Sequence, residues 1–232
     1  MNLTHFNRSP QPVEAAPFPA ADPIVRALVE RHLSQPRKTI LDLGCGRGNN
    51  TMYLAEQGHR VTAVDSNETY LQELAAQVEQ LPPLFRGLIT IKKADISEKL
   101  FLANSFDAIL CTKVLHELKD KKTALFTLGC IREATKPQGI NIVTGYTKTA
   151  SEIVPPNGPV LFDKDELGVT YEQEDWTVLY SQEHNPPSTG KKGGGKYKRF
   201  EELVTGKPKA DCGPTDLRTF ANSRMGEYSA RV

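Results

Sequence analysis

The chain has 232 residues, of which 25% are charged and 38% hydrophobic, and its formal net charge is +1. This length supports one α/β domain with a sizeable core, and the near-zero charge provides no global field to attract nucleic acid or an anionic membrane. No segment approaches the roughly 20 apolar residues of a spanning helix, and no apolar run follows a basic start as in a signal peptide.

The cysteines give no sign of a metal site or a redox motif. The four cysteines form no C-x-x-C pair and no zinc spacing, so the sequence predicts no metal site. We expect a cytoplasmic protein with no membrane partner.

The chain begins with a proline-rich segment, residues 1–21, that we expect to be flexible because it has little hydrophobic pattern. Asp22-Pro23 then predicts a helix start, with Asp22 as the N-cap and Pro23 at the first helical position. Its predicted buried stripe is Ile24, Leu28, Val29 and Leu33.

The most informative stretch follows this helix. Ile40-Leu41-Asp42-Leu43 is an apolar strand that runs into Gly44-Cys45-Gly46-Arg47-Gly48, and a helix-forming run starts near Met52. Glycines let a ligand approach the main chain, and a helix N-terminus presents free N–H groups and partial positive charge. A strand, a glycine loop and a helix in this order predict a nucleotide-type site.

The spacing of the glycines narrows the ligand. A dinucleotide fingerprint is G-x-G-x-x-G, whereas this loop is G-x-G-x-G with Asn50 beyond it. The carboxylate of Asp42, two residues before the first glycine, suits a cationic ligand better than a pyrophosphate.

Three later strands each carry an aspartate. Strand 60–64 ends in Asp65, about 20 residues beyond the loop, where a carboxylate can accept both ribose hydroxyls. Strand 88–93 leads to Asp95, and a third strand contains Asp107 near its start.

Helices and turns separate these strands. Asn67 and Asp120 are predicted N-caps of helices over about 68–81 and 121–135, the second with Leu125, Leu128 and Ile131 facing inward. A fifth strand follows at 140–144. Continuous apolar strands alternating with helices predict a parallel sheet covered on both faces.

The last third of the chain predicts an antiparallel hairpin. A short helix near 163–167 precedes a strand at 176–180, a lysine- and glycine-rich tip at 191–195, and a returning strand at 196–204. The tip lysines invite a nucleic-acid interpretation, but a solvated hairpin turn explains them better. The remaining residues, 205–232, are expected to form a tail that is disordered or closes over the site as a lid.

These residues together resemble class I S-adenosylmethionine-dependent methyltransferases, whose first motif is an acidic residue followed by G-x-G-x-G. The resemblance implies a Rossmann-like α/β fold with a seven-stranded, mostly parallel sheet, a C-terminal antiparallel hairpin, and a methyltransferase domain over 22–204. Loop 44–54, segment 58–67, Leu161-Phe162 and Glu183-His184 look most like the tellurite-resistance methyltransferases. The insert at 185–188 and the tail after Pro208 depart from that family and leave the acceptor open.

The resemblance also implies the cofactor and its site. S-adenosyl-L-methionine would be bound, and S-adenosyl-L-homocysteine released, by a set of loop and strand-end residues. These are Asp42, Gly44, Cys45, Gly46, Gly48, Asn50, Asp65, Ser66, Asp95, Ile96, Cys111, Thr112 and Lys113.

No catalytic base is assigned from the sequence. His116, Tyr146 and His184 are candidates if the acceptor must lose a proton, but each could equally be a packing or surface residue. A soft anionic acceptor needs no base.

The sequence therefore predicts an EC 2.1.1 enzyme that methylates a small molecule by in-line displacement. One alternative is a non-catalytic, or RNA- or protein-modifying, relative that keeps the cofactor fold. Another is a nicotinamide-dependent oxidoreductase, against which the glycine spacing argues. The oligomeric state is open.

Overall fold

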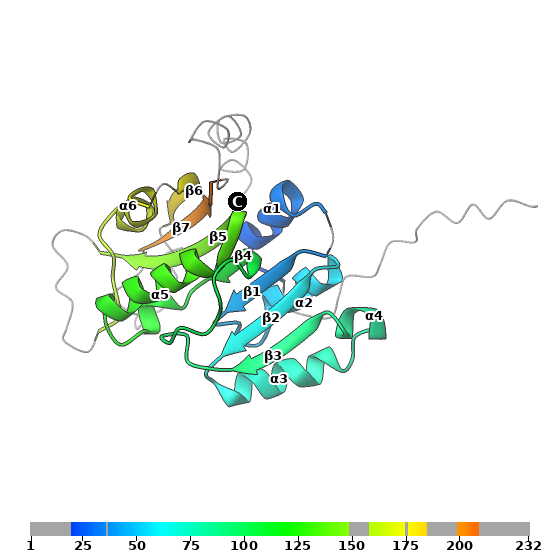
Figure 1. The fold of residues 1–232 in the computed structure, drawn as a ribbon. Coiled ribbons are helices and arrows are strands. Elements are labelled where there is room, and N and C mark those ends of the chain that lie inside the picture. Colours follow the sequence, from blue (N-terminus) through cyan, green and yellow to red (C-terminus); the bar gives the residue numbers. More distant parts are fainter. Residues whose placement is uncertain (1–19, 36, 149–157, 175, 185–198, 209–232) are drawn as a thin grey trace, which may run out of the picture.

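The computed structural model describes residues 20–35, 37–148, 158–174, 176–184 and 199–208. They form one seven-stranded sheet of order β3-β2-β1-β4-β5-β7-β6, with helices on both faces (Figure 1). Strands β1 to β5 pair in parallel, and β7 lies antiparallel between β5 and β6. The predicted fold class, a mostly parallel sheet closed by an antiparallel hairpin, is confirmed.

The strands are β1 (Thr39–Leu43), β2 (Arg60–Asp65), β3 (Ile89–Lys93), β4 (Phe106–Cys111), β5 (Thr135–Thr147), β6 (Thr177–His184) and β7 (Arg199–Gly206). The helices are α1 (Pro23–His32), α2 (Asn49–Glu56), α3 (Glu68–Val78), α4 (Pro83–Arg86), α5 (Lys121–Ala134) and α6 (Glu166–Glu172), with a 3-10 turn η1 (Leu115–Glu117). No helix among these described residues is both long and apolar enough to cross a membrane.

The core lies on the two faces of the sheet. On one face α1 and α2 pack on the strands, and α3 covers the neighbouring part through Leu74 and Val78. On the other face α5 and α6 pack through Leu128, Ile131 and Tyr171. Successive residues of a strand point to opposite faces, so the parallel strands are apolar on both sides.

The predicted buried stripes of α1 and α5 are confirmed except for one residue in each helix. In α1 Leu28 and Val29 are buried as predicted, but Val25 is buried in place of Ile24, which is half-buried. In α5 Ala124 is buried, whereas Leu125 is 37% exposed. Hydrophobicity alone favours the larger side chain of each neighbouring pair, but the smaller one faces the core in both helices.

Two of the three predicted helix caps are confirmed. The side chain of Asn67 accepts from the Tyr70 backbone N–H, and that of Asp120 accepts from the Thr123 N–H. Asp22 precedes α1 as predicted but makes no side-chain cap bond. Its carboxylate binds a lysine ammonium instead, as described below.

The hairpin strands run further than predicted. β6 continues to His184, and β7 includes the fully buried Thr205 and ends at Gly206, two residues past the predicted domain end. α3 ends at Val78, three residues early, and a short α4 follows that the sequence did not predict. The predicted flexible start (1–19 of it), the lysine tip 191–195 and the tail from 209 onward lie outside the described residues.

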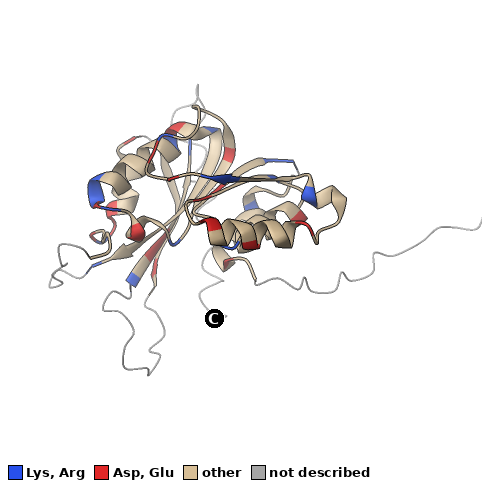
Figure 2. Ribbon diagram, turned by 90° about the horizontal axis from the view of Figure 1, so that it is seen from below, with Lys and Arg blue, Asp and Glu red and all other residues tan. Residues whose placement is uncertain are grey.

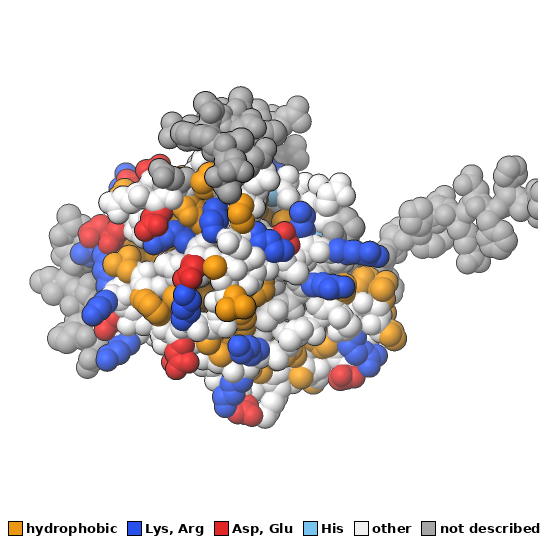
Figure 3. Space-filling model, viewed as in Figure 1, with side chains coloured by type: hydrophobic (Ala, Val, Ile, Leu, Met, Phe, Trp, Pro, Cys, Tyr) orange, Lys and Arg blue, Asp and Glu red, His pale blue; other side chains and the backbone are white. Residues whose placement is uncertain are grey.

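Charges of both signs are spread over the described elements rather than gathered by sign (Figure 2). On the face shown in Figure 3, lysines and arginines alternate with acidic and apolar side chains. Over the described part of the chain, this distribution lacks the basic stripe that a nucleic-acid interface requires.

Candidate functional site

A cleft of about 490 Å³ opens at the carboxyl ends of β1, β2 and β4. In Figure 1 the arrowheads of β1, β2 and β3 mark this edge of the sheet. Ligands of open α/β sheets bind at this edge, where the strand order reverses on either side of β1. The lining residues are Gly44, Gly46, Asp65, Ser66, Tyr70, Asp95, Ile96, Ser97, Lys113, Val114, Glu117, Leu118, Lys119 and Thr123.

The glycine loop forms the floor of this cleft because its backbone is left-handed at each glycine. The φ angles of Gly44, Gly46 and Gly48 are 78°, 53° and 86°. A Cβ on Gly44 would lie 2.2 Å from Val114 Cγ2, whereas one on Gly46 would meet nothing within 4 Å. The first glycine is required by packing, and the second leaves the main chain open to a ligand.

Asp65 at the end of β2 is fixed by the loop it faces. Its Oδ2 accepts from the Gly46 backbone N–H and its Oδ1 from the Asn67 N–H, both at 2.8 Å. Each oxygen keeps a second lone pair. The half-buried carboxylate can therefore accept two further hydrogen bonds from the cleft, as a vicinal diol would supply.

Asp95 lies on the opposite wall in an exposed turn. Its Oδ1 accepts from the Ser97 backbone N–H at 2.8 Å, and this bond holds the pKa of Asp95 below its usual range. The adjacent Ile96 is buried, so one wall of the cleft is apolar beside an ionised acceptor. A flat heterocycle with an amino group fits such a wall.

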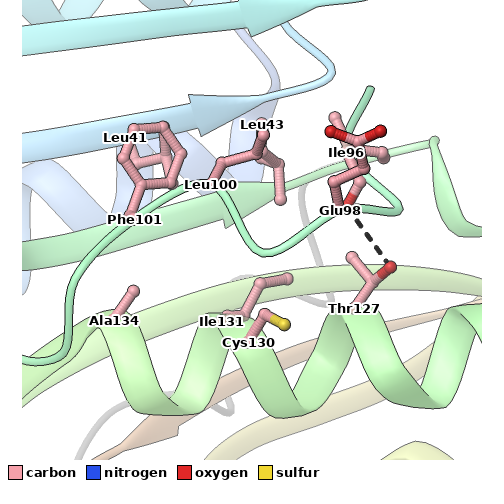
Figure 4. Close-up of a pocket in the computed structure, with 10 residues that line it drawn as sticks. All are labelled: Leu41, Leu43, Ile96, Glu98, Leu100, Phe101, Thr127, Cys130, Ile131 and Ala134. Carbon is pink, nitrogen blue, oxygen red and sulfur yellow. Dashed lines mark hydrogen bonds between the residues drawn. The ribbon is translucent and has the colours of Figure 1, made fainter. Parts of the chain in front are cut away.

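A small cavity of about 20 Å³ lies behind this wall, between β1 and α5 (Figure 4). The Thr127 hydroxyl beside it lies 3.0 Å from the Thr123 carbonyl oxygen and 3.4 Å from the Ile96 carbonyl oxygen, and can donate to either. The space holds one water molecule at most. The cavity is therefore too small to hold a ligand.

Asp42 does not line the cleft. It is 2% exposed on β1 and accepts from the Thr51 hydroxyl of α2 at 2.6 Å. Burial raises the pKa of Asp42 to about 6. Its carboxylate supports the loop from behind, and its charge would be stabilised by a cation in the cleft.

The other predicted residues that do not line the cleft are Cys45, Gly48, Asn50, Cys111 and Thr112. Asn50 bridges three elements, donating to the Thr112 hydroxyl at 3.3 Å and accepting from the Asp22 backbone N–H at 3.0 Å. Burial raises the pKa of Cys111 to about 12 and also raises the pKa of Cys45, so neither thiol is a nucleophile. These residues shape the cleft wall.

Lys113 connects the cleft to α1. Its backbone is left-handed, with φ 59°, and its N–H donates to the Thr144 hydroxyl at 2.5 Å. Its ammonium reaches Asp22 Oδ1 at 2.5 Å, which explains why Asp22 does not cap α1. The ion pair between Lys113 and Asp22 could not be predicted from the sequence, because its two residues are 91 positions apart in the chain.

The three candidate bases all lie near the carboxyl edge. The ring of His116 stacks on Tyr146 with centroids 4.0 Å apart, and burial lowers the pKa of His116. His184 Nε2 lies 2.8 Å from Glu202 Oε2, and its ring stacks on Phe200. The geometry assigns none of them to a substrate atom.

Asp107 does not join the site. It lies at the opposite, amino-terminal edge, where its Oδ2 accepts from Thr39 N at 2.8 Å, from the Thr39 hydroxyl at 2.6 Å and from Lys136 Nζ at 3.1 Å. It joins β1, β4 and β5. Its place at the start of a strand is the signal that excludes it from the edge where strands end.

Sequence reasoning also missed several lining residues, namely Tyr70, Ser97, Val114, Glu117, Leu118, Lys119 and Thr123. Most come from the irregular segment around η1, which has no periodic pattern. Among the described residues no group of His, Cys, Asp or Glu side chains is arranged to hold a metal ion.

Comparison with known proteins shows which family this chain resembles. A family model described as a methyltransferase domain matches residues 40–139. The chain is 28% identical over 157 residues to a mitochondrial ubiquinone biosynthesis O-methyltransferase of Schizosaccharomyces pombe, covering 61% of this chain and 56% of that protein. It is 29% identical over 147 residues to a probable S-adenosyl-L-methionine-dependent methyltransferase, TehB, of Haemophilus influenzae, covering 62% and 48%. The chain thus spans about half the length of the curated relatives it matches.

Solved structures of methyltransferases also superpose on this chain. The crystal structure of Haemophilus influenzae TehB superposes with a TM-score of 0.67 and 25% identity, covering 81% of this chain and 62% of that one. A Burkholderia thailandensis 1,6-didemethyltoxoflavin-N1-methyltransferase, solved with S-adenosylhomocysteine, gives a TM-score of 0.63 at 24% identity, covering 81% and 78%. The second likeness establishes the fold alone.

Proposed function

We propose that this chain, which belongs to the class I S-adenosylmethionine-dependent methyltransferases, transfers the methyl group of S-adenosylmethionine to a small-molecule acceptor. The main support for the proposal is the position of the Asp65 carboxylate at the cleft. Its two oxygens are fixed by the backbone N–H groups of Gly46 and Asn67 and keep lone pairs free at the cleft. That arrangement suits the ribose of an adenosyl cofactor.

Other residues fit the remaining parts of such a cofactor. Asp95 and Ile96 offer an acceptor and an apolar surface for adenine. The open backbone at Gly46 leaves room for the amino-acid end, and the buried charge of Asp42 lies behind the loop. A cation in the cleft would relieve the cost of ionising Asp42, whose pKa is raised by burial.

The bound cofactor supplies a sulfonium that is already activated for displacement. The protein's task is then alignment: the acceptor must approach the methyl carbon opposite the sulfur, and water must be kept away. Lys113, with its left-handed backbone, and Val114 border the cleft where β4 ends and α1 begins. We place the methyl group there.

The name of one relative supports a small acceptor, since the Schizosaccharomyces pombe protein is a ubiquinone biosynthesis O-methyltransferase. The alternative remains a non-catalytic, or RNA- or protein-modifying, relative. The even mixture of charges in Figure 2 speaks against an RNA partner.

Calorimetry with S-adenosylhomocysteine tests the proposal. We expect micromolar binding to the wild type and at least tenfold weaker binding to Asp65→Asn, which loses one acceptor oxygen and the charge. Glu133→Gln, on the exposed side of α5, is the matched control and should bind like the wild type. Absence of binding to the folded wild type would overturn the proposal.

A further inference from the structure

Two stacked pairs of rings lie at the carboxyl edge of the sheet, beyond the cleft residues Lys113 and Val114. His116 stacks on Tyr146 with an interplanar angle of 14° and centroids 4.0 Å apart. His184 stacks on Phe200 at 16° and 5.0 Å. Tyr146 of β5 lies directly opposite Phe200 of β7, which lies opposite His184 of β6. These four residues, which we call the ring row, therefore run from η1 across three strands.

The ring row faces the side of the sheet that α1 covers. Ile142 and Val204 pack in the cluster that contains α1, and strand alternation places Tyr146, Phe200 and Glu202 on their face. The rings are not sealed in the core, since the side chains of His116 and His184 are 16% and 32% exposed. Half-buried flat surfaces beside a cofactor cleft are suited to stacking on a flat ligand.

The charges around the ring row do not favour an anion. The ammonium of Lys113 is already paired with Asp22 at 2.5 Å. Glu202 lies 2.8 Å from His184, and its side chain is only 16% exposed. The pKa of Glu202 is raised above its usual value, because the effect of burial exceeds the opposing effect of the neighbouring His184 imidazole. Arg199 points to the opposite face by strand alternation.

We propose that the acceptor is a planar ring compound, neutral or cationic, with an exchangeable N–H or O–H, which stacks on the ring row, and that it is not a metalloid oxyanion. This inference rests on the proposed methyl transfer and names its substrate class. At the ring row an oxyanion would meet the carboxylates of Asp22 and Glu202, and the Lys113 ammonium there is already paired with Asp22.

The proposed transfer needs no group beyond the cofactor, the acceptor and two side chains of the hairpin. The acceptor nitrogen or oxygen forms a bond to the methyl carbon while the carbon–sulfur bond breaks and its electron pair stays on sulfur, which gives S-adenosylhomocysteine. In this proposal the exchangeable proton passes to Nδ1 of His184, because Nε2 of that ring is buried 2.8 Å from Glu202 Oε2. The carboxylate of Glu202 stabilises the resulting positive charge and is a positioning residue.

An acceptor panel tests the class. The full chain is incubated with S-adenosylmethionine and either a phenol, a catechol, an aminopyridine or a quinolinol, or else tellurite, selenite or 2-mercaptoethanol, and released S-adenosylhomocysteine is measured. We expect at least tenfold faster release with one or more ring compounds. Faster release with an oxyanion or the thiol, or none with any ring compound while the wild type binds S-adenosylhomocysteine, overturns the inference alone. Failure to bind S-adenosylhomocysteine overturns the proposed function as well.

Variants test the ring row itself. Phe200→Leu removes a ring but little volume, and should raise the KM of the ring acceptor about tenfold while leaving the affinity for S-adenosylhomocysteine unchanged. Phe126→Leu, at a 51% exposed site on α5, is the matched control and should not change KM. Phe200→Tyr should restore the wild-type KM, which separates stacking from a folding defect. Equal KM values for Phe200→Leu and the control would contradict the proposal.

Discussion

The buried carboxylate of Asp42 lowers the stability of the folded chain when it is ionised, and it lies behind the glycine loop of the cleft. Burial raises the pKa of Asp42 from its ordinary value of 3.8 to about 6. Below pH 4 the carboxyl is protonated in both folded and unfolded chains. Between pH 4 and 6 the unfolded chain releases this proton first, so stability falls as pH rises. Above pH 6 the full cost remains, at most about 3 kcal/mol.

Asp42→Asn should remove this cost. We expect the ligand-free variant to be more stable than the wild type by about 1 to 3 kcal/mol at pH 7.5, with the difference vanishing near pH 4. Urea unfolding at the two pH values measures it. A difference that does not change with pH would show that the charge of Asp42 is not responsible.

The aspartates also show what single residues reveal in a sequence. Asp65 and Asp95 follow strand ends, and both line the cleft. Asp107 has the same chemistry but sits at a strand start, where it binds Thr39 and Lys136. Residue type alone could not separate these cases, whereas position along the strand could. The pairing of Asp22 with Lys113 gave no sequence signal, because only the fold brings α1 beside the end of β4.

At the scale of elements, the entry into α2 depends on Gly48. This N-cap has φ 86°, and a Cβ there would lie 2.2 Å from Leu74 Cδ1 of α3. Gly48→Ala should lower the free energy of unfolding by about 2 to 4 kcal/mol, from backbone strain and overpacking together. Chemical denaturation measures the loss.

Gly129 in α5 provides the matched control. The nearest atom to a Cβ there, Arg132 Nη2, is 3.9 Å away, and the residue lies within a helix. Gly129→Ala should therefore stabilise the protein by about 0.5 to 1 kcal/mol. Similar losses in both variants would mean that the space around the glycine does not decide the outcome.

The cap of α3 offers a smaller effect. Asn67→Ala removes the bond to the Tyr70 N–H and should cost about 1 kcal/mol, whereas Asn67→Asp keeps an acceptor at the helix N-terminus and should be near neutral. Thermal unfolding of the two variants checks the difference. Equal destabilisation by both would exclude the cap bond as its source.

Elements with strong local signals were predicted well. β1 and the starts of α3 and α5 are where the apolar pattern and the caps place them. The elements around the ring row were predicted less well. The 3-10 turn η1 is too short to show a periodic pattern. The contact of His184 with Glu202 depends on the register between β6 and β7. A cross-strand register set by a long connection cannot be derived from the residues of either strand.

At the scale of the whole molecule, the sequence predicts a mostly parallel sheet, and right-handed crossovers leave few strand orders for it, of which the structure has β3-β2-β1-β4-β5-β7-β6. A ligand in the central cleft touches the ends of β1 and β2 and the loop after β4 at once. Its binding should therefore stabilise the sheet as a unit.

S-adenosylhomocysteine at 100 times its dissociation constant should add about 2.7 kcal/mol of stability, which for a chain of this size raises Tm by roughly 5 to 10 °C. Scanning calorimetry measures the shift. The shift should shrink in Asp65→Asn and persist in Glu133→Gln. An unchanged Tm at saturating ligand would contradict binding to the folded state.

The insertion of β7 between β5 and β6 has an evolutionary consequence. The residues that line the cofactor cleft end at Thr123 in chain order, whereas Phe200, Glu202 and His184 come from the terminal hairpin. In the proposed enzyme, one segment of the chain holds the cofactor and another contacts the acceptor. The residues of the hairpin can therefore change, and with them the proposed acceptor, without altering any residue that lines the cleft.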